Sequence, residues 1–275
     1  MYEAVCIDLD GTLLDDNKKI SEKNIEILNK VKDKGIEIII ATGRALPRAI
    51  DFTNVLGFKH TLIANNGAVI SDNKEEKIFD YNPIPQRVFK EVYDIGKDLG
   101  VYPVIHIYEQ KLKTSLIIPD KDEVQWHKQS VPSLEYISKY SDFDIMNLNN
   151  IMTMVYIENV NLVDEFRNLV NKRDIICQNH VLNIFKKDKI MFECLNKEAN
   201  KIIGVEKLLK LKNINLKNTI ALGDETNDFN MLRKVGCGIA MKNGTKAIKE
   251  ISNKVSEYDN NNSGVAIELE KIFLK

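Results

Sequence analysis

The stretch Ala4-Val5-Cys6-Ile7-Asp8-Leu9-Asp10-Gly11-Thr12 decides the fold of this chain. Its first residues are mostly apolar, as in a strand that is buried on both faces of a parallel sheet. Asp8 and Asp10 stand two residues apart, so the period-two alternation of an extended chain places them on one side. Gly11 allows a close approach of the backbone. The stretch therefore predicts a first strand that delivers a charged loop at its carboxyl end.

The same rhythm of strand and helix recurs toward both ends of the chain. Ser21 is a candidate N-cap for a helix that Gly35 closes, and Pro47 can begin another helix. Further strand candidates are residues 36–41, 61–64, 219–222 and 238–241, and further helix candidates are residues 201–211, 228–234 and a terminal segment with Val265, Leu269 and Ile272. Strands that alternate with helices predict an α/β fold with a doubly wound, Rossmann-like parallel sheet.

The middle of the chain lacks the repeated strand with a polar loop at its end. It holds helix candidates at 87–99 and 162–170 and strand candidates at 101–108 and 152–157. We therefore predict a second α/β domain, residues 83–190, inserted into a core made of residues 1–82 and 191–275. The run Asn82-Pro83-Ile84-Pro85 is the expected outgoing connection.

Composition excludes several classes of protein. The chain has 275 residues, with 39 Lys+Arg against 40 Asp+Glu, so it offers no basic excess for a nucleic-acid partner. Four scattered cysteines (6, 177, 194 and 237) form no C-x-x-C pair, and the histidines form no H-x-x-x-H, so neither a disulfide framework nor a zinc site is favoured. No apolar run approaches the ~18–20 residues that span a bilayer. We expect a cytoplasmic protein with no membrane association.

Polar residues also follow the other strands of the predicted sheet. Thr42-Gly43-Arg44 follows the second strand, Asn65-Asn66-Gly67 follows the third, and Gly223-Asp224-Glu225-Thr226-Asn227-Asp228 follows strand 219–222. Ligands of doubly wound sheets collect at the carboxyl ends of the strands, so these groups should meet around one crevice. Carboxylates that share one small volume need a neutralising partner, and Mg²⁺ prefers a few carboxylates with water and phosphate oxygens.

Each motif alone also has a structural interpretation. Asp-Gly is a common turn, and Thr42-Gly43 suits a passage from strand to helix. Asp224 and Asp228 suit the N-terminus of a helix, and Lys201 could be a surface charge. Their joint occurrence at one edge of one domain would require several independent coincidences, which favours a functional site.

In this order, the motifs around Asp8, Thr42, Lys201 and Asp224 resemble those of the haloacid dehalogenase (HAD) superfamily of phosphotransferases. The large insert between the second and third motifs, with Asn65-Asn66-Gly67-Ala68 after the third strand, resembles the Cof-type subfamily (subclass IIB). The resemblance implies a HAD core with an inserted α/β cap of type C2 that selects the substrate. One residue departs from the subfamily pattern, because Ile202 follows Lys201 where glycine is usual.

The resemblance also implies roles for individual residues. Asp8 would attack phosphorus and form an aspartyl-phosphate, and Asp10, protonated at neutral pH, would act as general acid and then as base. The implied catalytic residues are Asp8, Asp10, Thr42 and Lys201; the implied phosphate or substrate contacts are Leu9, Gly11, Gly43, Asn66 and Asn227; the implied Mg²⁺ ligands are Asp8, Asp10 through its backbone carbonyl, Asp224 and Asp228. Arg44 is more typical of a surface salt bridge than of a catalytic group.

The function predicted from these residues is a Mg²⁺-dependent phosphatase of small phosphomonoesters, with sugar phosphates favoured. A phosphomutase of the phosphomannomutase type is an alternative, in which a sugar hydroxyl replaces water as the second acceptor. A catalytically silent phospholigand-binding protein is another. We expect a small phosphorylated metabolite as the partner, and a monomer or weak homodimer. No G-x-G-x-x-G or G-x-x-x-x-G-K-[ST] follows any strand, so nucleotide cofactor binding is not favoured.

Overall fold

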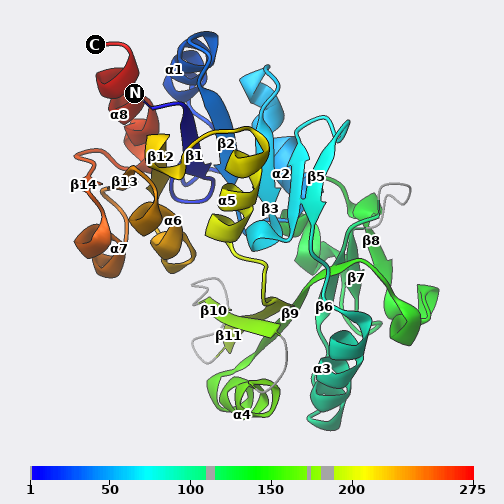
Figure 1. The fold of residues 1–275 in the computed structure, drawn as a ribbon. Coiled ribbons are helices and arrows are strands. Elements are labelled where there is room, and N and C mark those ends of the chain that lie inside the picture. The colour runs from blue at the N-terminus through cyan, green and yellow to red at the C-terminus, as the bar shows by residue number, and fades with distance from the viewer. Residues whose placement is uncertain (1, 110–114, 172–174, 181–188) are drawn as a thin grey trace. The chain divides into compact units, whose positions relative to one another are not determined.

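A computed structural model describes residues 2–109, 115–171, 175–180 and 189–275 of the chain. The chain divides into two compact units (Figure 1). The first unit combines Met1–Tyr81 with Asn200–Lys275, and the second is the continuous segment Asn82–Ala199. One domain is therefore inserted into another.

The first unit is built on an eight-stranded sheet with the order β14-β13-β12-β1-β2-β3-β4-β5. Its strands are β1 (Ala4–Asp8), β2 (Glu37–Ala41), β3 (Thr61–Ala64), β4 (Val69–Asp72), β5 (Ile78–Tyr81), β12 (Thr219–Gly223), β13 (Cys237–Ala240) and β14 (Lys254–Val255). Its helices are α1 (Glu22–Asp33), α2 (Leu46–Thr53), α5 (Lys201–Leu211), α6 (Phe229–Lys234), α7 (Lys246–Ile251) and α8 (Gly264–Phe273). The strands from β14 to β3 run parallel, and β4 and β5 continue the sheet in antiparallel pairs.

The central strand β1 brings the polar loops of its neighbours together. All five of its residues are buried, and it pairs in parallel with β2 on one side and β12 on the other (Figure 1). Asp8 lies in register with Ala41, the last residue of β2. Because parallel strands end at the same edge of a sheet, the residues after β1, β2 and β12 are neighbours there.

Helices cover both faces of this sheet. On one face, α5 and α6 pack Ile202, Val205 and Met231 against a cluster that includes Cys6 and Ile39 of the strands. Elsewhere in the unit, α1 and α8 pack together, and the backbone N–H of Ala266 donates to Asn24 Oδ1 at 2.9 Å. The start of α1 follows the sequence signal, since the Ser21 hydroxyl accepts from the N–H of Asn24. The predicted doubly wound α/β core is confirmed.

The second unit is a six-stranded sheet, order β10-β11-β9-β6-β7-β8, with two α-helices among its described residues. Its elements are α3 (Gln86–Asp98), β6 (Val104–Ile107), β7 (Leu116–Ile118), β8 (Ile137–Lys139), β9 (Ile151–Asn159), α4 (Val160–Val170), β10 (Ile175–His180) and β11 (Lys189–Asn196). The pairs are antiparallel except for β7 with β8. Phe89 of α3 and Phe166 of α4 pack with Tyr156 and Phe192 of the sheet in one apolar cluster.

The predicted boundaries of the inserted domain need correction. The sequence assigned residues 191–275 to the core, but the chain returns to the first unit at Asn200. The physical reason is that β11 extends to Asn196 and pairs with β9 from Lys189 to Leu195, so residues 191–196 belong to the second sheet and the second unit ends at Ala199. At the outgoing connection, the division falls between Tyr81 and Asn82 rather than between residues 82 and 83.

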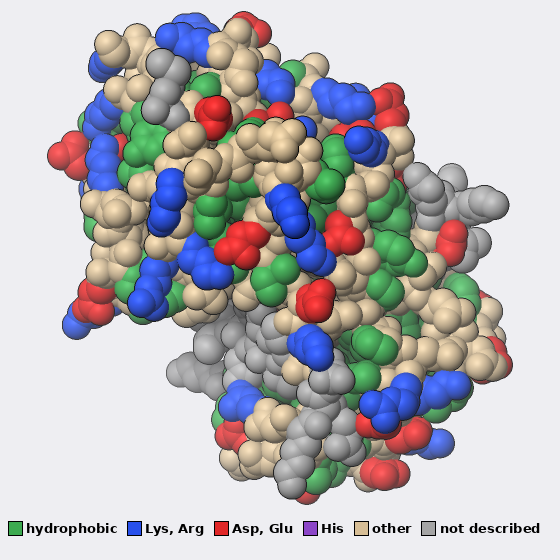
Figure 2. Space-filling view, viewed as in Figure 1, with side chains coloured by type: hydrophobic (Ala, Val, Ile, Leu, Met, Phe, Trp, Pro, Cys, Tyr) green, Lys and Arg blue, Asp and Glu red, His purple; other side chains and the backbone are tan. Residues whose placement is uncertain are grey.

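The exterior of the structure agrees with the balanced composition. Figure 2 shows acidic and basic side chains interspersed on the face in view, with no large field of one sign. Among the described residues, no helix combines the length and apolar character that crossing a membrane would require.

Gly67 lies where two loops of the core unit touch, and these loops position polar residues. It lies in the turn after β3 with φ of +104°, and a Cβ at this position would stand 2.4 Å from the backbone oxygen of Asn200. Asn200 is the N-cap of α5, and its side chain accepts from the N–H of Ile202. The missing side chain of Gly67 therefore lets the loop after β3 lie directly on the start of α5.

We expect Gly67→Ala to destabilise the core unit more than Gly57→Ala does. Gly57 also has positive φ, +76°, but nothing lies within 4 Å of its added Cβ, so only backbone strain of about 1–2 kcal/mol applies. At Gly67 the overlap with backbone adds about 1–3 kcal/mol. Urea unfolding followed by circular dichroism measures both variants, and equal losses would contradict this account of Gly67.

Candidate active site

A buried lysine joins two buried aspartates at the edge where the parallel strands end. Lys201, the first residue of α5, places its Nζ 2.6 Å from Asp8 Oδ1 and 2.7 Å from Asp228 Oδ1. Lys201 is 1% exposed, Asp8 5% and Asp228 0%. Asp8 ends β1, and Asp228 lies in the turn before α6. Three segments that are distant in sequence thus meet in one ion-pair cluster.

Asp224 is the third carboxylate of this cluster. Its Oδ1 accepts from the Thr12 hydroxyl at 3.0 Å, and its backbone N–H donates to Asp228 Oδ2 at 3.1 Å. Asp228 Oδ2 also accepts from the N–H of Glu225, so it organises the turn that presents Asp224. Gly11 has φ of +73°, and a Cβ there would stand 2.2 Å from Asp224 Oδ2. Only glycine lets the loop after β1 pass this close to the carboxylate.

The electrostatics of the cluster favour a further positive charge. Burial, and then the Asp228 carboxylate, raise the pKa of Asp8 well above its usual range, and Lys201 offsets only part of this effect. Burial and Asp228 likewise raise the pKa of Asp224 to about 7. Burial acts to lower the pKa of Lys201, but the two carboxylates outweigh it and raise that pKa, so the ammonium keeps its proton. One ammonium cannot neutralise three carboxylates.

The three carboxylates are close enough to share a metal ion. Each of Asp8, Asp224 and Asp228 offers an oxygen within 4.8 Å of the others, and all three residues are buried. Within the described part of the chain, these three form the one such group. The structure thus brings together three of the four residues predicted as metal ligands.

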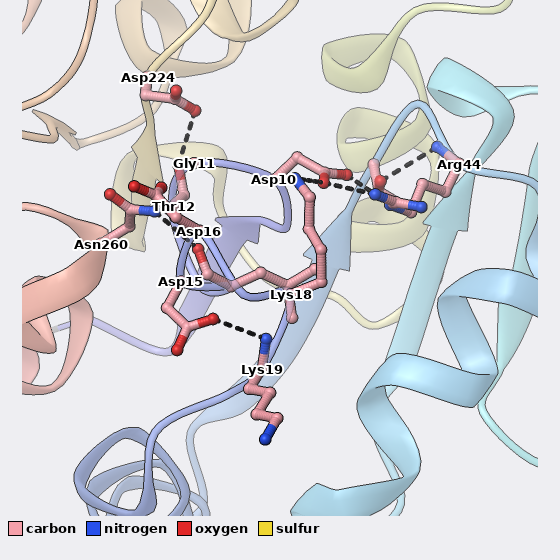
Figure 3. A network of polar contacts seen from close by, with 12 residues as sticks. Asp10, Gly11, Thr12, Asp15, Asp16, Lys18, Lys19, Arg44, Asp224 and Asn260 are labelled. Atoms are coloured by element: carbon pink, nitrogen blue, oxygen red, sulfur yellow. Dashed lines mark hydrogen bonds and ion pairs between the residues drawn. The ribbon is translucent and has the colours of Figure 1, made fainter. Parts of the chain in front are cut away.

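Asp10, the fourth predicted ligand, directs its carboxylate elsewhere. Figure 3 shows this side chain turned toward Arg44 and Lys18 and away from Asp224. Arg44 Nε donates to Asp10 Oδ2 and Arg44 Nη2 to Asp10 Oδ1, both at 2.6 Å, and Lys18 Nζ lies 2.9 Å from Oδ1. Burial acts to raise the pKa of Asp10, but the hydrogen bonds and charges of Arg44 and Lys18 outweigh it and lower that pKa.

Two expectations about this region change with the structure. Asp10 was expected to carry a proton at neutral pH, but the two cations hold it as a carboxylate in this state. Arg44 does form a salt bridge, as expected, but its partner is a predicted catalytic residue 34 positions away rather than a neighbour on the surface. Sequence alone gave no signal for this pairing, because it depends on how the loops after β1 and β2 meet.

The loops after β2 and β3 interlock beside the cluster. Thr42 is 1% exposed, its hydroxyl accepts from the N–H of Arg44 at 3.1 Å, and its carbonyl accepts from the N–H of Asn66 at 3.0 Å. A Cβ on Gly43 would stand 3.2 Å from Asn66 Oδ1, and the same oxygen accepts from Asn227 Nδ2 at 3.1 Å. The predicted phosphate contacts Gly43, Asn66 and Asn227 therefore lie side by side.

The loop after β1 is also tied to the C-terminal part of the chain. Its residue Leu9 is buried, and the Leu9 carbonyl accepts from the N–H of Leu14 at 2.8 Å. Asn243 Nδ2 donates to the Gly11 carbonyl at 2.7 Å, and Asn260 Nδ2 donates to the Leu14 carbonyl at 3.0 Å. Neither Asn243 nor Asn260 could be recognised from sequence, since asparagines are common in polar loops and carry no distinguishing pattern there.

Comparison with known proteins identifies the family. The model of the haloacid dehalogenase-like hydrolases matches residues 5–269. A 5-amino-6-(5-phospho-D-ribitylamino)uracil phosphatase of Bacillus subtilis is 27% identical, over 98% of this chain and 97% of the relative. A crystal structure from Thermotoga maritima is 25% identical, with a TM-score of 0.82, and covers 98% of this chain and 97% of its own. A HAD subclass IIB sugar phosphatase has a TM-score of 0.76 at 21% identity, over 99% of this chain and all of its own.

The chain belongs to the haloacid dehalogenase-like hydrolases, within the Cof-type group. Further curated relatives are named as phosphatases or putative phosphatases. The protein is accordingly an enzyme of the HAD phosphatase class, and both the recognition of the family and the enzyme class predicted from sequence are confirmed.

The raised pKa of Asp224 gives a prediction about stability. In the unfolded chain its pKa is about 3.9, so the folded protein binds this proton more tightly and loses stability as the pH rises from about 4 through 7. Asp10, with a lowered pKa, acts in the opposite direction, and only below about pH 4. With chelator present, we expect Asp224→Asn to be more stable than wild type at pH 8, by on the order of 1–3 kcal/mol, with the difference vanishing near pH 4.

Urea unfolding at several pH values in EDTA measures this difference. Asp33→Asn, at the exposed end of α1, is the matched control and should leave the pH dependence unchanged. An Asp224→Asn protein that is less stable than wild type at pH 8 would show that the carboxylate repulsion has been misassigned.

Proposed function

We propose that this phosphatase is Mg²⁺-dependent and hydrolyses small phosphomonoesters, with sugar phosphates the favoured class, through an aspartyl-phosphate on Asp8. The observation that carries the proposal is the buried contact of Asp8 with Lys201 beside Asp224 and Asp228. Burial of a carboxylate costs free energy unless the charge is paired with good geometry. Here Asp8 ends the central strand, at the edge of the sheet where ligands of this fold bind.

The chemistry available to Asp8 is nucleophilic attack on phosphorus. A carboxylate is a modest nucleophile, but phosphoryl transfer depends mainly on positioning and on neutralising the phosphoryl oxygens. Lys201 Nζ bonds to Oδ1 of Asp8, which fixes the side chain and leaves Oδ2 to attack. The bond from Oδ2 to phosphorus would form as the bond from phosphorus to the ester oxygen breaks.

The donor set fits a hard divalent cation. Among the residues that the structure describes, no hydrogen bond is made to Asp8 Oδ2 or Asp224 Oδ2, whereas Asp228 is satisfied through Lys201 and two backbone N–H groups. Asp224 would hold Mg²⁺ through Oδ2 and Asp8 through Oδ1, the oxygen that does not attack, with the Asp10 carbonyl as a further candidate. Asp228 would orient Lys201 and the turn. When bound, Mg²⁺ neutralises charge on the phosphoryl oxygens.

The remaining residues suit phosphoryl binding and proton transfer. The Thr42 hydroxyl accepts from the Arg44 N–H, so its own hydrogen is free to point toward a phosphoryl oxygen. The N–H of Gly43 and the amides of Asn66 and Asn227 are further donors in the same loops. Asp10 is a carboxylate in this state, so it would first take a proton from solvent. It would then give that proton to the leaving oxygen and later take one from the attacking water.

The name of one relative supports the favoured substrate class. The Bacillus subtilis relative is named for a substrate whose phosphate sits on a ribityl chain, an open polyhydroxylated carbon chain. A phosphate on a sugar or sugar alcohol is an alkyl ester. When its bond to phosphorus breaks, the sugar oxygen leaves as a poorly stabilised alkoxide unless it is protonated. Such substrates need an acid like Asp10. We expect no nucleic-acid partner, and the monomer or weak homodimer stays a prediction.

The decisive activity test is release of inorganic phosphate from a panel of sugar phosphates, nucleotide monophosphates, pyridoxal phosphate, flavin mononucleotide and p-nitrophenyl phosphate. We expect Mg²⁺-dependent turnover that EDTA abolishes and that Asp8→Asn lowers by at least about 10³-fold, because the amide cannot form the phosphoenzyme. Asp33→Asn, an exposed replacement of the same kind, should keep full activity.

Each alternative function has its own outcome in this assay. Isomerised sugar phosphate without free phosphate would replace the phosphatase with a phosphomutase. A folded wild-type protein that binds the phosphate esters but converts none would reduce it to a binding module.

Metal binding is tested apart from activity by titration calorimetry with MgCl₂. The carboxylates must lose their protons before they bind the ion, and the pKa of Asp224 is about 7, so the apparent affinity at pH 8 should exceed that at pH 5.5 by tenfold or more. Asp224→Asn should remove the binding heat, and Asp33→Asn should retain it. Equal affinity at both pH values would exclude this cluster as the metal site.

A further inference from the structure

A cavity of about 280 Å³ lies in the core unit, at the edge of the sheet opposite to Asp8. Its wall includes Glu37, which begins β2, and Thr61, which begins β3, whereas Asp8 ends the parallel strand β1. Its volume is near the lower end of small-molecule sites, which measure about 300–1,000 Å³. Its lining shares no described residue with the carboxylate cluster of the candidate active site.

Two ammonium groups of this wall share one carboxylate. The Glu37 oxygens lie 3.8 Å from Lys32 Nζ and 3.1 Å from Lys212 Nζ. Lys59, in the same wall, pairs with carboxylates other than Glu37. An ammonium has three N–H donors, so a shared carboxylate leaves one positive charge and several donors over. Lys32 and Lys212 can therefore bind an anion.

A buried histidine of the same wall presents an unpaired acceptor. His60 is 2% exposed, and its Nδ1 lies 3.0 Å from the Phe58 carbonyl. A carbonyl only accepts, so Nδ1 carries the hydrogen and Nε2 has a lone pair. Among the residues that the structure describes, Nε2 has no hydrogen-bond partner. Burial lowers the pKa of His60 to about 4, so the ring is neutral at pH 8 and Nε2 stays an acceptor.

We propose that this cavity binds a small phosphate anion that carries an O–H group, either monohydrogen phosphate or a short phosphorylated polyol. The phosphoryl oxygens would accept from Lys32 and Lys212, and the O–H group would donate to Nε2 of His60. Both lysines also suit the carboxyl ends of α1 and α5, where positive charge complements the helix dipole. That role explains neither the cavity nor the unpaired nitrogen. The site is separate from the proposed catalytic centre and needs no turnover.

The experiment titrates inorganic phosphate, sulfate and glycerol 3-phosphate at pH 8 into metal-free wild-type protein with ¹⁵N-labelled histidine. Phosphate and sulfate are then mainly dianions, but only phosphate keeps a hydrogen. We expect the His60 Nε2 resonance to move upfield as phosphate binds, because the nitrogen accepts a hydrogen bond. Phosphate should bind at least about tenfold more tightly than sulfate, which leaves Nε2 unpaired.

Glycerol 3-phosphate distinguishes the two sources of the anion. If it moves the same resonance at lower concentration than phosphate does, the site is assigned to phosphorylated polyols. If it needs a higher concentration, the site is assigned to inorganic phosphate.

Four variants test the individual contacts. Glu37→Gln keeps an acceptor for the Thr61 hydroxyl but removes the competing charge, so phosphate should bind at least about threefold more tightly. Lys212→Gln should bind it at least about threefold more weakly. Lys246→Gln, at the exposed start of α7, is the matched control and should behave as wild type. His60→Phe assigns the resonance by its loss and should abolish the preference for phosphate over sulfate.

Three results would overturn the proposal. A His60 resonance that neither phosphate nor glycerol 3-phosphate moves would exclude the cavity as a phosphate site. Equal affinities for phosphate and sulfate would reduce it to unselective attraction by lysines. Unchanged or weaker phosphate binding by a folded Glu37→Gln protein would contradict the competition at Glu37, and this variant and Lys212→Gln test the site even if His60→Phe does not fold. The titration measures no phosphate release, so failure of the phosphatase mechanism is a separate outcome.

Discussion

The ion pair of Lys201 with Asp8 and Asp228 is the constraint on which the rest of the core depends. An ammonium and carboxylates that are almost wholly removed from water are tolerated only when their geometry is good and their remaining atoms are bonded. The turn before α6 meets this demand because its backbone N–H groups donate to Asp228. The N-cap of α5 fixes where the helix that carries Lys201 begins. The close passages at Gly11 and Gly67 follow from the same demand, since each loop must reach the cluster without a side chain in the way.

The sheet converts sequence order into this arrangement. β1 lies between β2 and β12, so a polar loop lies on each side of its carboxyl end. Arg44 and Thr42 come from one neighbour and Asp224 from the other. The site thus has two electrostatic sides. On the first, three carboxylates lie around the single ammonium of Lys201. On the second, the Asp10 carboxylate pairs with both Arg44 and Lys18. The pKa of Asp224 is raised on the first side and that of Asp10 is lowered on the second.

Sequence could predict the elements whose signals are local. The buried strands of the parallel sheet and the capped helix α1 have regular patterns, and polar residues at strand ends predicted Asp8 and Asp224 as neighbours. The role of Lys201 beside Asp8 was implied by the resemblance to the family. The pattern did not reveal β11 as part of the inserted sheet, because an antiparallel partner is chosen by contacts with β9 that are distant in sequence. The salt bridge between Arg44 and Asp10 and the contact of Asn243 with Gly11 were missed for the same reason: each is a meeting of two loops, and single residues in loops carry no periodicity.

The split of the core unit has a consequence for the order in which the protein is made. Asp8 is synthesised 193 positions before its partner Lys201, and Asn260, which donates to the Leu14 carbonyl, follows later still. At common rates of translation, Lys201 is synthesised on the order of 10–40 s after Asp8. The inserted unit, one continuous segment, is complete before then and can fold while the core is still unfinished. On the ribosome, the carboxylate cluster is therefore assembled only after the inserted unit has been made, although Asp8 emerges before that unit.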